Sequence, residues 1–234
     1  MHANELSRFE LKELIEKDYV AILPIGSCEQ HGPHLPITTD SNLAEYMSNE
    51  IAKRYDVIVF PTLNFGYSWV WNGLPGTITL SQNTFKMVVY ELASSLSIMG
   101  FKKVLLVNGH DSNKTALKYV VRDLSEKFET KYLNIFYPNM NEIYKNNMES
   151  DMWHGMFHAD EFETSLMLAY DDKKVRLDKL IKEYPDKPRF YGYDDSPLWN
   201  VSKSGVFGDA TKASKNKGIK MMDQFMIEID KLLD

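Results

Sequence analysis

Short apolar runs alternate with longer amphipathic runs over the first part of the chain. The apolar runs predict four β-strands, at Tyr19–Ile25, Val57–Phe60, Val104–Val107 and Leu133–Tyr137. Between them, apolar residues recur at three- and four-residue spacing, which predicts helices at Leu43–Arg54, Asn83–Met99 and Lys114–Phe128. Strands that are apolar throughout and separated by helices are typical of a parallel sheet buried between helices. The pattern therefore predicts a three-layer α/β/α sandwich with a mainly parallel central sheet.

The second part of the chain has a less regular pattern. Helices are expected at Glu161–Tyr170 and at Ala213–Leu233, where a long amphipathic run closes the chain. Between them, residues 182–200 combine three prolines with several aromatic residues, which favours an excursion on the surface. No internal repeat, Gly/Ser tract or long charge block separates one part from another. We therefore expect residues 1–234 to form a single domain.

Composition narrows the class of protein. Hydrophobic residues make up 44% and charged residues 26% of the chain, which excludes disordered and collagen-like classes. Lys and Arg number 27 against 33 Asp and Glu, so the formal net charge of −6 favours a small-molecule partner over nucleic acid or a membrane surface. A single cysteine, Cys28, cannot form an internal disulfide, and Met1–Lys17 lacks the apolar core of a signal peptide. We expect a cytoplasmic protein.

Residues that can bind metal follow the first predicted strand. The segment Gly26–Pro36 reads GSCEQHGPHLP, and Thr39 and Asp40 follow it at the start of the next helix. In extended backbone, Glu29 and His31 point the same way and can bind one ion, and a turn can bring Asp40 towards them. The alternative is that Asp40 is only a helix cap and the other two are surface residues. Because ligands bind at the carboxyl ends of parallel strands, this segment is a candidate site.

Two further clusters occupy comparable positions. The third strand is followed by Asn108–Asn113, which contains His110; the alternative is a local turn whose Asn113 caps the next helix. His158 and Glu163 are five residues apart, so they cannot be neighbours on one helix face. With His158 in a loop and Glu163 in the first turns of a helix, both can face one site. The alternative is that the acidic residues of this segment only complement the helix dipole.

The residue types in these clusters indicate the chemistry. Mixed imidazole and carboxylate ligands suit Zn²⁺, Mn²⁺ or Fe²⁺ and do not suit a structural thiolate site. A carboxylate can bridge two adjacent ions, and two ions polarise a carbonyl and lower the pKa of a bridging water to near ~7. The resulting hydroxide is a nucleophile at neutral pH, so the clusters predict a hydrolase.

At these residues the sequence resembles the creatininase family of metal-dependent amidohydrolases. The resemblance runs from Leu23 to Gly218, with the three clusters and two further segments, at residues 74–78 and 204–209, in family order. It implies the creatininase-like α/β/α fold, two divalent metal ions, with zinc favoured over manganese or iron, and a homo-oligomer, often a hexamer. The implied metal ligands are Glu29, His31, Asp40, His110 and Glu163, of which Asp40 is the bridging residue.

The resemblance also implies a reaction. A metal-bridging hydroxide attacks the carbonyl of a small cyclic amide or formamide, and His158 matches the catalytic histidine that passes a proton to the leaving nitrogen. Ser112 stands where creatininases carry a metal-proximal glutamate, which argues against creatinine itself as substrate. Deformylases, peptide-processing enzymes and a hydrolase of a cyclic ketone are alternatives within the family. Residues that we expect to contact the substrate are Trp71, Ser112, Trp153 and His154.

Two alternatives lie outside this reaction. Cys28 paired with His31 or His34 could act as a nucleophile, although a lone cysteine is more often a small buried hydrophobic residue. A relative that binds metal or a ligand without turnover would have no need of His158. His34, which is surrounded by Gly-Pro and Leu-Pro, is expected to organise its loop.

Overall fold

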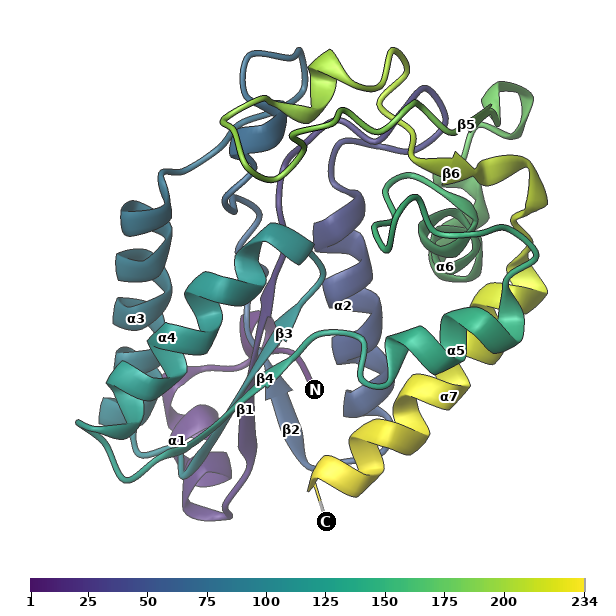
Figure 1. The fold of residues 1–234 in the computed structure, drawn as a ribbon. Coiled ribbons are helices and arrows are strands. Elements are labelled where there is room, and N and C mark those ends of the chain that lie inside the picture. Colours follow the sequence, from purple (N-terminus) through teal and green to yellow (C-terminus); the bar gives the residue numbers. More distant parts are fainter. Residues whose placement is uncertain (234) are drawn as a thin grey trace. The chain divides into compact units, whose positions relative to one another are not determined.

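The computed structural model describes residues 1–233 and divides into two compact units (Figure 1). The sheet unit comprises Met1–Ser27, Asp40–Tyr67 and Thr79–Phe136. The loop-rich unit comprises residues 28–39, residues 68–78 and the chain from Tyr137 onward.

The sheet unit contains the four predicted strands. They are β1 (Val20–Ile25), β2 (Val57–Val59), β3 (Lys103–Asn108) and β4 (Lys131–Ile135). They form one sheet in the order β2-β1-β3-β4, and every pairing is parallel. Ile22 in β1 is aligned with Val59 on one side and Leu105 on the other, and all three are buried. The parallel sheet expected from the apolar runs is confirmed.

Helices cover both faces of this sheet. On one face lie α1 (Arg8–Glu16), α3 (Gln82–Met99) and α4 (Lys114–Ser125), and on the other lies α2 (Thr39–Ala52) (Figure 1). Alternate strand residues such as Leu23 and Leu106 share one apolar cluster with Phe85 and Val89 of α3 and Leu117 of α4. The three-layer α/β/α arrangement predicted from the sequence is therefore present within the sheet unit.

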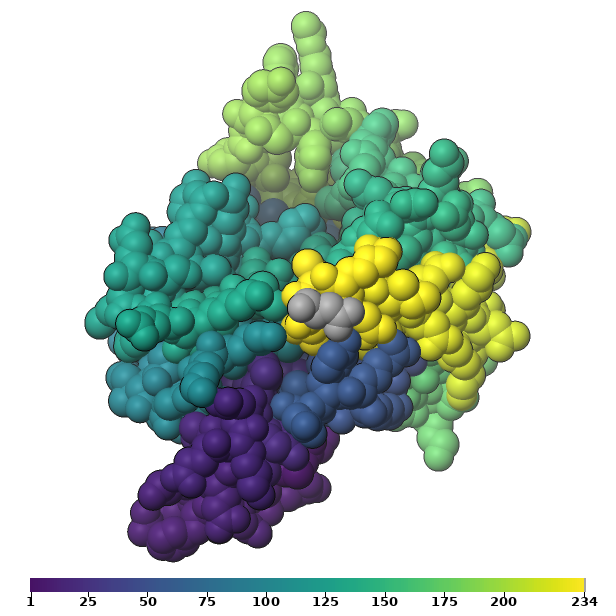
Figure 2. Space-filling model, turned by 90° about the horizontal axis from the view of Figure 1, so that it is seen from below, coloured from purple at the N-terminus to yellow at the C-terminus, as the bar shows by residue number. Residues whose placement is uncertain are grey.

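The pattern did not predict α1. It begins with a capping box: Ser7 Oγ accepts from Glu10 N, and Glu10 Oε2 accepts from Ser7 N. No residue of α1 is buried, and its atoms form an exposed projection in dark purple (Figure 2). Its inner side is apolar, since Leu11, Leu14 and Ile15 are partly buried against the apolar cluster of the sheet unit.

The loop-rich unit contains α5 (Met140–Asn147), α6 (Glu161–Asp171) and α7 (Lys215–Leu233), with a short antiparallel pair formed by β5 (Lys182–Glu183) and β6 (Gly208–Asp209). The predicted helices α6 and α7 are confirmed, and α5 was not predicted. α7 packs on α6 so closely that a Cβ on Gly218 would lie 1.9 Å from Ser165 O. Short 3-10 helices occupy Ala3–Glu5, Trp69–Trp71, Asp111–Asn113, Asp172–Lys174, Leu177–Lys179, Leu198–Asn200 and Ala210–Lys212.

The proline-rich segment between β5 and β6 is a surface excursion, as predicted. Its Tyr193 side chain is 91% exposed and Phe190 is 60% exposed. In the space-filling view this segment is drawn in yellow-green (Figure 2). None of the helices within residues 1–233 combines the length and the apolar character needed to cross a membrane.

Candidate metal centre

Within the sheet unit, two of the predicted ligands form a buried pair. His110 follows the end of β3, and Asp40 lies in the first turn of α2. His110 Nδ1 is 3.0 Å from Asp40 Oδ2, and His110 Nε2 is 2.9 Å from the main-chain oxygen of Tyr67. Because a carbonyl can only accept, Nε2 carries a proton, and in the neutral imidazole the lone pair of Nδ1 then faces the carboxylate. A cation placed at Nδ1 and Oδ2 would satisfy both atoms.

Asparagine side chains hold this end of the sheet. Asn108 Oδ1 accepts from His110 N at 3.1 Å, and Asn113 Nδ2 donates to Gly26 O at 3.0 Å. Asn113 is the N-cap residue of α4, as the alternative expected, but its side chain makes no capping hydrogen bond, and its Oδ1 accepts from Tyr67 N instead. A Cβ on Gly109 would lie 2.1 Å from Asp40 O, so only glycine permits this close approach to α2.

Within the loop-rich unit, four more predicted residues come together. The candidate ligand atoms of Glu29, His31 and His158 all lie within 4.8 Å of one another, and all three residues are buried. His31 Nε2 is 3.8 Å from Glu163 Oε2, and His158 Nδ1 is 3.7 Å from Glu29 Oε1. Glu29 and His31 therefore point the same way, as their spacing predicted.

His31 repeats the arrangement of His110. Its Nδ1 is 3.1 Å from Glu29 O, so this nitrogen donates to a main-chain carbonyl, and in the neutral imidazole the lone pair of Nε2 then faces Glu163. A metal-bound imidazole typically donates its other N–H in this way. Glu29 is only 1% exposed, and buried carboxylates are costly unless a cation compensates them. The donor types, their burial and these orientations fit a divalent metal ion.

The start of α6 places His158 and Glu163 as predicted. His158 lies in the preceding loop, and Glu163 lies in the first turn, where its carboxylate accepts from Ala159 N. Asp160 is the N-cap and accepts from the backbone N–H groups of Phe162 and Glu163. Burial raises the pKa of Asp160 to about 7, against hydrogen bonds, including one from Tyr144, that lower it. Asp160 thus serves the N-terminus of α6, in agreement with the alternative that acidic residues here complement the helix dipole.

Glu161 has a different structural role. It is fully buried, accepts from the backbone N–H groups of Glu149 and Ser150, and forms an ion pair with Lys217 of α7. It joins three segments of the loop-rich unit.

His158 is held between aromatic rings. Its imidazole is stacked on Trp71, with ring centroids 4.8 Å apart and an interplanar angle of 25°, and lies 4.4 Å from the ring of His31. Both the side-chain Nε2 and the main-chain O of Gln30 lie 2.9 Å from His158 Nε2. Sequence reasoning assigned no role to Gln30, because an amide within a ligand-rich motif has no distinctive signal of its own.

His34 and Cys28 have structural contacts. His34 Nε2 is 2.9 Å from Thr164 Oγ1, and its carbonyl accepts from Arg176 N, as expected of a residue that organises its loop. Burial, together with the neighbouring His31, lowers the pKa of His34 to about 4. Cys28 is buried, and its Sγ lies 3.6 Å from Gly76 O.

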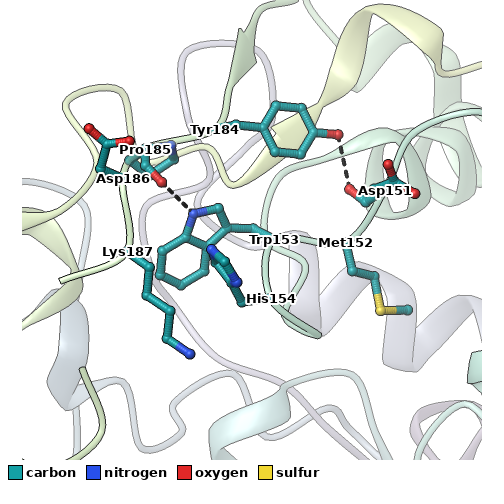
Figure 3. Close-up of a pocket in the computed structure, with 8 residues that line it drawn as sticks. All are labelled: Asp151, Met152, Trp153, His154, Tyr184, Pro185, Asp186 and Lys187. Atoms are coloured by element: carbon teal, nitrogen blue, oxygen red, sulfur yellow. Dashed lines mark hydrogen bonds between the residues drawn. The ribbon is translucent and has the colours of Figure 1, made fainter. Parts of the chain in front are cut away.

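The residues expected to contact substrate occupy different places. Trp153 and His154 line a hollow of about 650 Å³ with Tyr184, Pro185 and Lys187 among others (Figure 3). The indole of Trp153 donates to Pro185 O at 2.6 Å, as the dashed line in Figure 3 marks. Ser112 is half-buried in the 3-10 helix that follows His110.

An aromatic chain connects this hollow to the catalytic candidate. The ring of Trp153 lies 4.8 Å from Phe207, Phe207 lies 6.0 Å from Trp71, and Trp71 stacks on His158. The hollow is thus separated from His158 by two further rings.

The creatininase family model, described as creatinine amidohydrolase, matches residues 4–233. The chain belongs to the creatininase family. It is 29% identical over 218 residues to the creatinine amidohydrolase of Pseudomonas putida, covering 86% of this chain and 83% of that protein. It is 26% identical over 216 residues to a mycofactocin precursor peptide peptidase of Mycolicibacterium smegmatis, covering 88% and 81%. This creatininase-family chain is a hydrolase.

Solved structures of creatininases share its fold. A creatinine amidohydrolase superposes with a TM-score of 0.87 at 25% identity, covering 99% of this chain and 96% of that one. A substituted creatininase of the Zn-Zn type gives 0.86 at 26% identity, and a structure entitled creatininase Mn gives 0.84 at 25%, both covering 99% and 96%. The names of the last two structures give zinc and manganese, which agrees with the buried donor groups of this chain.

Proposed function

We propose that this chain hydrolyses a C–N bond of a small cyclic amide or formamide with two divalent metal ions, zinc in preference to manganese or iron. The supporting observation is the shared orientation of His110 and His31. In each, one nitrogen donates to a main-chain carbonyl and the other faces a buried carboxylate. The proposed ligands are Glu29, His31, Asp40, His110 and Glu163, with Asp40 bridging the ions.

The metal ions, when bound, polarise the substrate carbonyl and lower the pKa of water so that it can attack at neutral pH. His158 is proposed as the proton carrier. Its Nε2 is occupied by Gln30, whereas Nδ1 faces Glu29, so Nδ1 is the atom that passes a proton to the leaving nitrogen. Trp71 fixes the plane of the imidazole by stacking.

Substrate contacts are proposed for Trp71, Ser112, Trp153 and His154. Trp71 is supported by its stack on His158, and Ser112 by its position two residues after His110. Trp153 and His154 line a hollow that the rings of Phe207 and Trp71 separate from His158, so their substrate contacts are proposed from the family resemblance alone. An indole at residue 71 and a hydroxyl at residue 112 favour a substrate more apolar than creatinine.

Metal exchange tests the function. Dialysis against a chelator should abolish hydrolysis of a panel of creatinine, cyclic amides, formamides and short peptides, and added Zn²⁺, Mn²⁺ or Fe²⁺ should restore it. Asp40→Asn and Glu163→Gln should each lower kcat by at least ~100-fold and reduce bound metal, measured by elemental analysis. Asp111→Asn is the matched control, because Asp111 is an exposed carboxylate next to His110 that pairs with Lys114.

Several outcomes would contradict the proposal. Active protein with less than one equivalent of metal would exclude metal-dependent hydrolysis. Loss of activity in Cys28→Ser but not in Asp40→Asn would favour a thiol nucleophile. Binding of two metal equivalents without cleavage of any compound in the panel would favour a non-catalytic binding protein.

We further propose that both units form one catalytic domain, since the family model spans them. A homo-oligomer, up to a hexamer, is proposed from the resemblance, and sedimentation velocity tests it. A cytoplasmic location is proposed from the lone cysteine, and cell fractionation tests it.

A further inference from the structure

The side-chain amide of Gln30 is oriented by two backbone groups. Its Oε1 accepts from Gly32 N at 3.0 Å, and its Nε2 donates to Gly205 O at 3.1 Å. A backbone N–H cannot accept and a carbonyl cannot donate, so only one orientation of the amide satisfies both. In this orientation Nε2 lies 2.9 Å from His158 Nε2. The main-chain N–H of Gln30 donates to Thr77 Oγ1, which fixes the residue's backbone as well.

Gln30 supports the edge of the imidazole while Trp71 supports its face. The main-chain O of Gln30 is also 2.9 Å from His158 Nε2, so the same residue offers this nitrogen a donor and an acceptor. The backbone of His158 is joined to the segment after Gly205, because Phe207 N donates to His158 O at 2.9 Å. His158 is therefore fixed from two directions by residues near Gly205.

Gly205 can take its place only as glycine. Its φ is +80°, and a Cβ there would lie 1.9 Å from Gln30 Oε1. Its N–H donates to Ser202 Oγ at 2.9 Å, so the chain from Ser202 to Gly205 forms one hydrogen-bonded turn.

One carboxylate holds this turn at the base of the excursion. Glu183, the last residue of β5, accepts from Ser202 Oγ at 2.9 Å, Lys203 N at 2.9 Å, Ser204 N at 3.0 Å and Ser204 Oγ. Partial burial raises the pKa of Glu183, but these hydrogen bonds outweigh it and hold the pKa below its ordinary value. The carboxylate thus remains the acceptor of all four hydrogen bonds at neutral pH.

We propose that Gln30 is a positioning residue for His158, and that Glu183 acts on the same imidazole through Gly205 and Gln30. The catalytic consequence rests on the proposed role of His158, whereas the positioning itself does not. Neither residue was singled out by the sequence pattern. The base of a surface excursion thereby sets the orientation of a buried histidine.

A spectroscopic measurement tests the positioning without a substrate. In zinc-loaded protein labelled with ¹³C and ¹⁵N histidine, the ring resonances of His158 are identified by their absence in His158→Ala. The stack on Trp71 shifts them upfield through the ring current. Gln30→Met removes both polar atoms of the amide at similar length, and should move these resonances towards those of an unstacked histidine. Glu183→Gln should move them in the same direction by less.

Kinetics on the best substrate of the panel test the consequence. Gln30→Met should lower kcat about 10- to 100-fold with KM nearly unchanged, the range expected for partners that orient a functional side chain. Glu183→Gln should have a smaller effect on kcat, and the double variant should be no slower than Gln30→Met alone, because both act along one path. Asp194→Asn is the matched control, since this exposed carboxylate accepts from Ser196 N within the same excursion.

The contrary results distinguish failure of the positioning role of Gln30, of the link through Glu183 and of the proposed function. Unmoved His158 resonances in Gln30→Met would overturn the positioning role, and a lower kcat with unmoved resonances would assign Gln30 to the substrate instead. Strictly additive effects in the double variant would overturn the link through Glu183. Moved resonances in a chain that hydrolyses nothing would leave the positioning intact and contradict the proposed function. Should Gln30→Met not fold, Glu183→Gln alone still tests the link.

Discussion

The two units keep their structures by different means. In the sheet unit, parallel ladders and a continuous aliphatic core fix the backbone, and only Asp18 among its non-glycine residues has a positive φ. In the loop-rich unit, Tyr137, Asn139, His154 and Ala159 have positive φ, and side chains bond to backbone groups along most loops. Burial is non-directional and spread over many residues, whereas each polar contact is a single directed bond. The comparison predicts that substitutions in the sheet unit mainly lower the free energy of unfolding. Substitutions in the loop-rich unit should mainly change the positions of the side chains that a polar contact holds.

The largest effect on stability is expected in the sheet unit. Leu106 in β3 is completely buried in the apolar cluster, so Leu106→Ala should lower the free energy of unfolding by about 2–5 kcal/mol. Urea unfolding measures this change. Leu92→Ala on α3 is the control, because its side chain is 40% exposed and its loss should cost less than about 1 kcal/mol. If Leu106→Ala lowered kcat strongly without lowering the free energy of unfolding, the proposed difference between the two units would be wrong.

A pH dependence is expected from the loop-rich unit. The unfolded chain takes up a proton at His34 near its ordinary pKa of 6.5, whereas the folded chain resists protonation until about pH 4. Between these two pKa values the unfolded state binds more protons than the folded state. The free energy of unfolding therefore decreases, by up to ~3 kcal/mol, as the pH is lowered from about 6.5 to about 4. His34→Gln should make this fall shallower, as measured by urea unfolding of metal-free protein. An equal slope in the two proteins would show that another group is responsible.

The smallest effect on stability is expected from alanine substitutions at two glycines, which distinguish backbone strain from a steric clash with a neighbouring side chain. Gly205 and Gly192 have similar positive φ, +80° and +85°, but a Cβ on Gly192 would meet nothing within 4 Å. Alanine at either position should cost about 1 kcal/mol of stability through strain. Only Gly205→Ala should also lower kcat, because its methyl group displaces the amide of Gln30. Equal kcat values in the two variants, with calorimetry as the measure of stability, would contradict this distinction.

The sequence predicted most of the sheet unit because burial produces periodicity. All four strands and the helices α2, α3 and α4 were found within a few residues of their bounds. β4 begins two residues earlier than predicted, because Lys131 and Tyr132 extend the ladder without belonging to an aliphatic run. α1 was missed because it has only nine residues, none of them fully buried, and α5 because it has only eight, starting after Asn139 at φ 57°.

The candidate site was predictable where the chemistry is carried by residue type. Histidines and carboxylates after strand ends are recognisable, and the structure groups Glu29, His31, His158 and Glu163 in one unit and Asp40 with His110 in the other. Gln30 and Glu183 were not predictable, because their roles depend on partners 128 to 175 residues away for the first and on four donors of one turn for the second. Ordinary polar residues become functional only through such folded contacts.

The acceptors behind the imidazoles of His110 and His31, the two histidines proposed as ligands, are peptide oxygens, those of Tyr67 and Glu29. Since every amino acid supplies the same carbonyl, no point substitution at residue 67 deletes the acceptor for His110. Side chains near the site can therefore be substituted, in nature or in directed evolution, so that substrate preference changes. The hydrogen bond from His110 to the main-chain oxygen of residue 67 does not depend on which residue stands there.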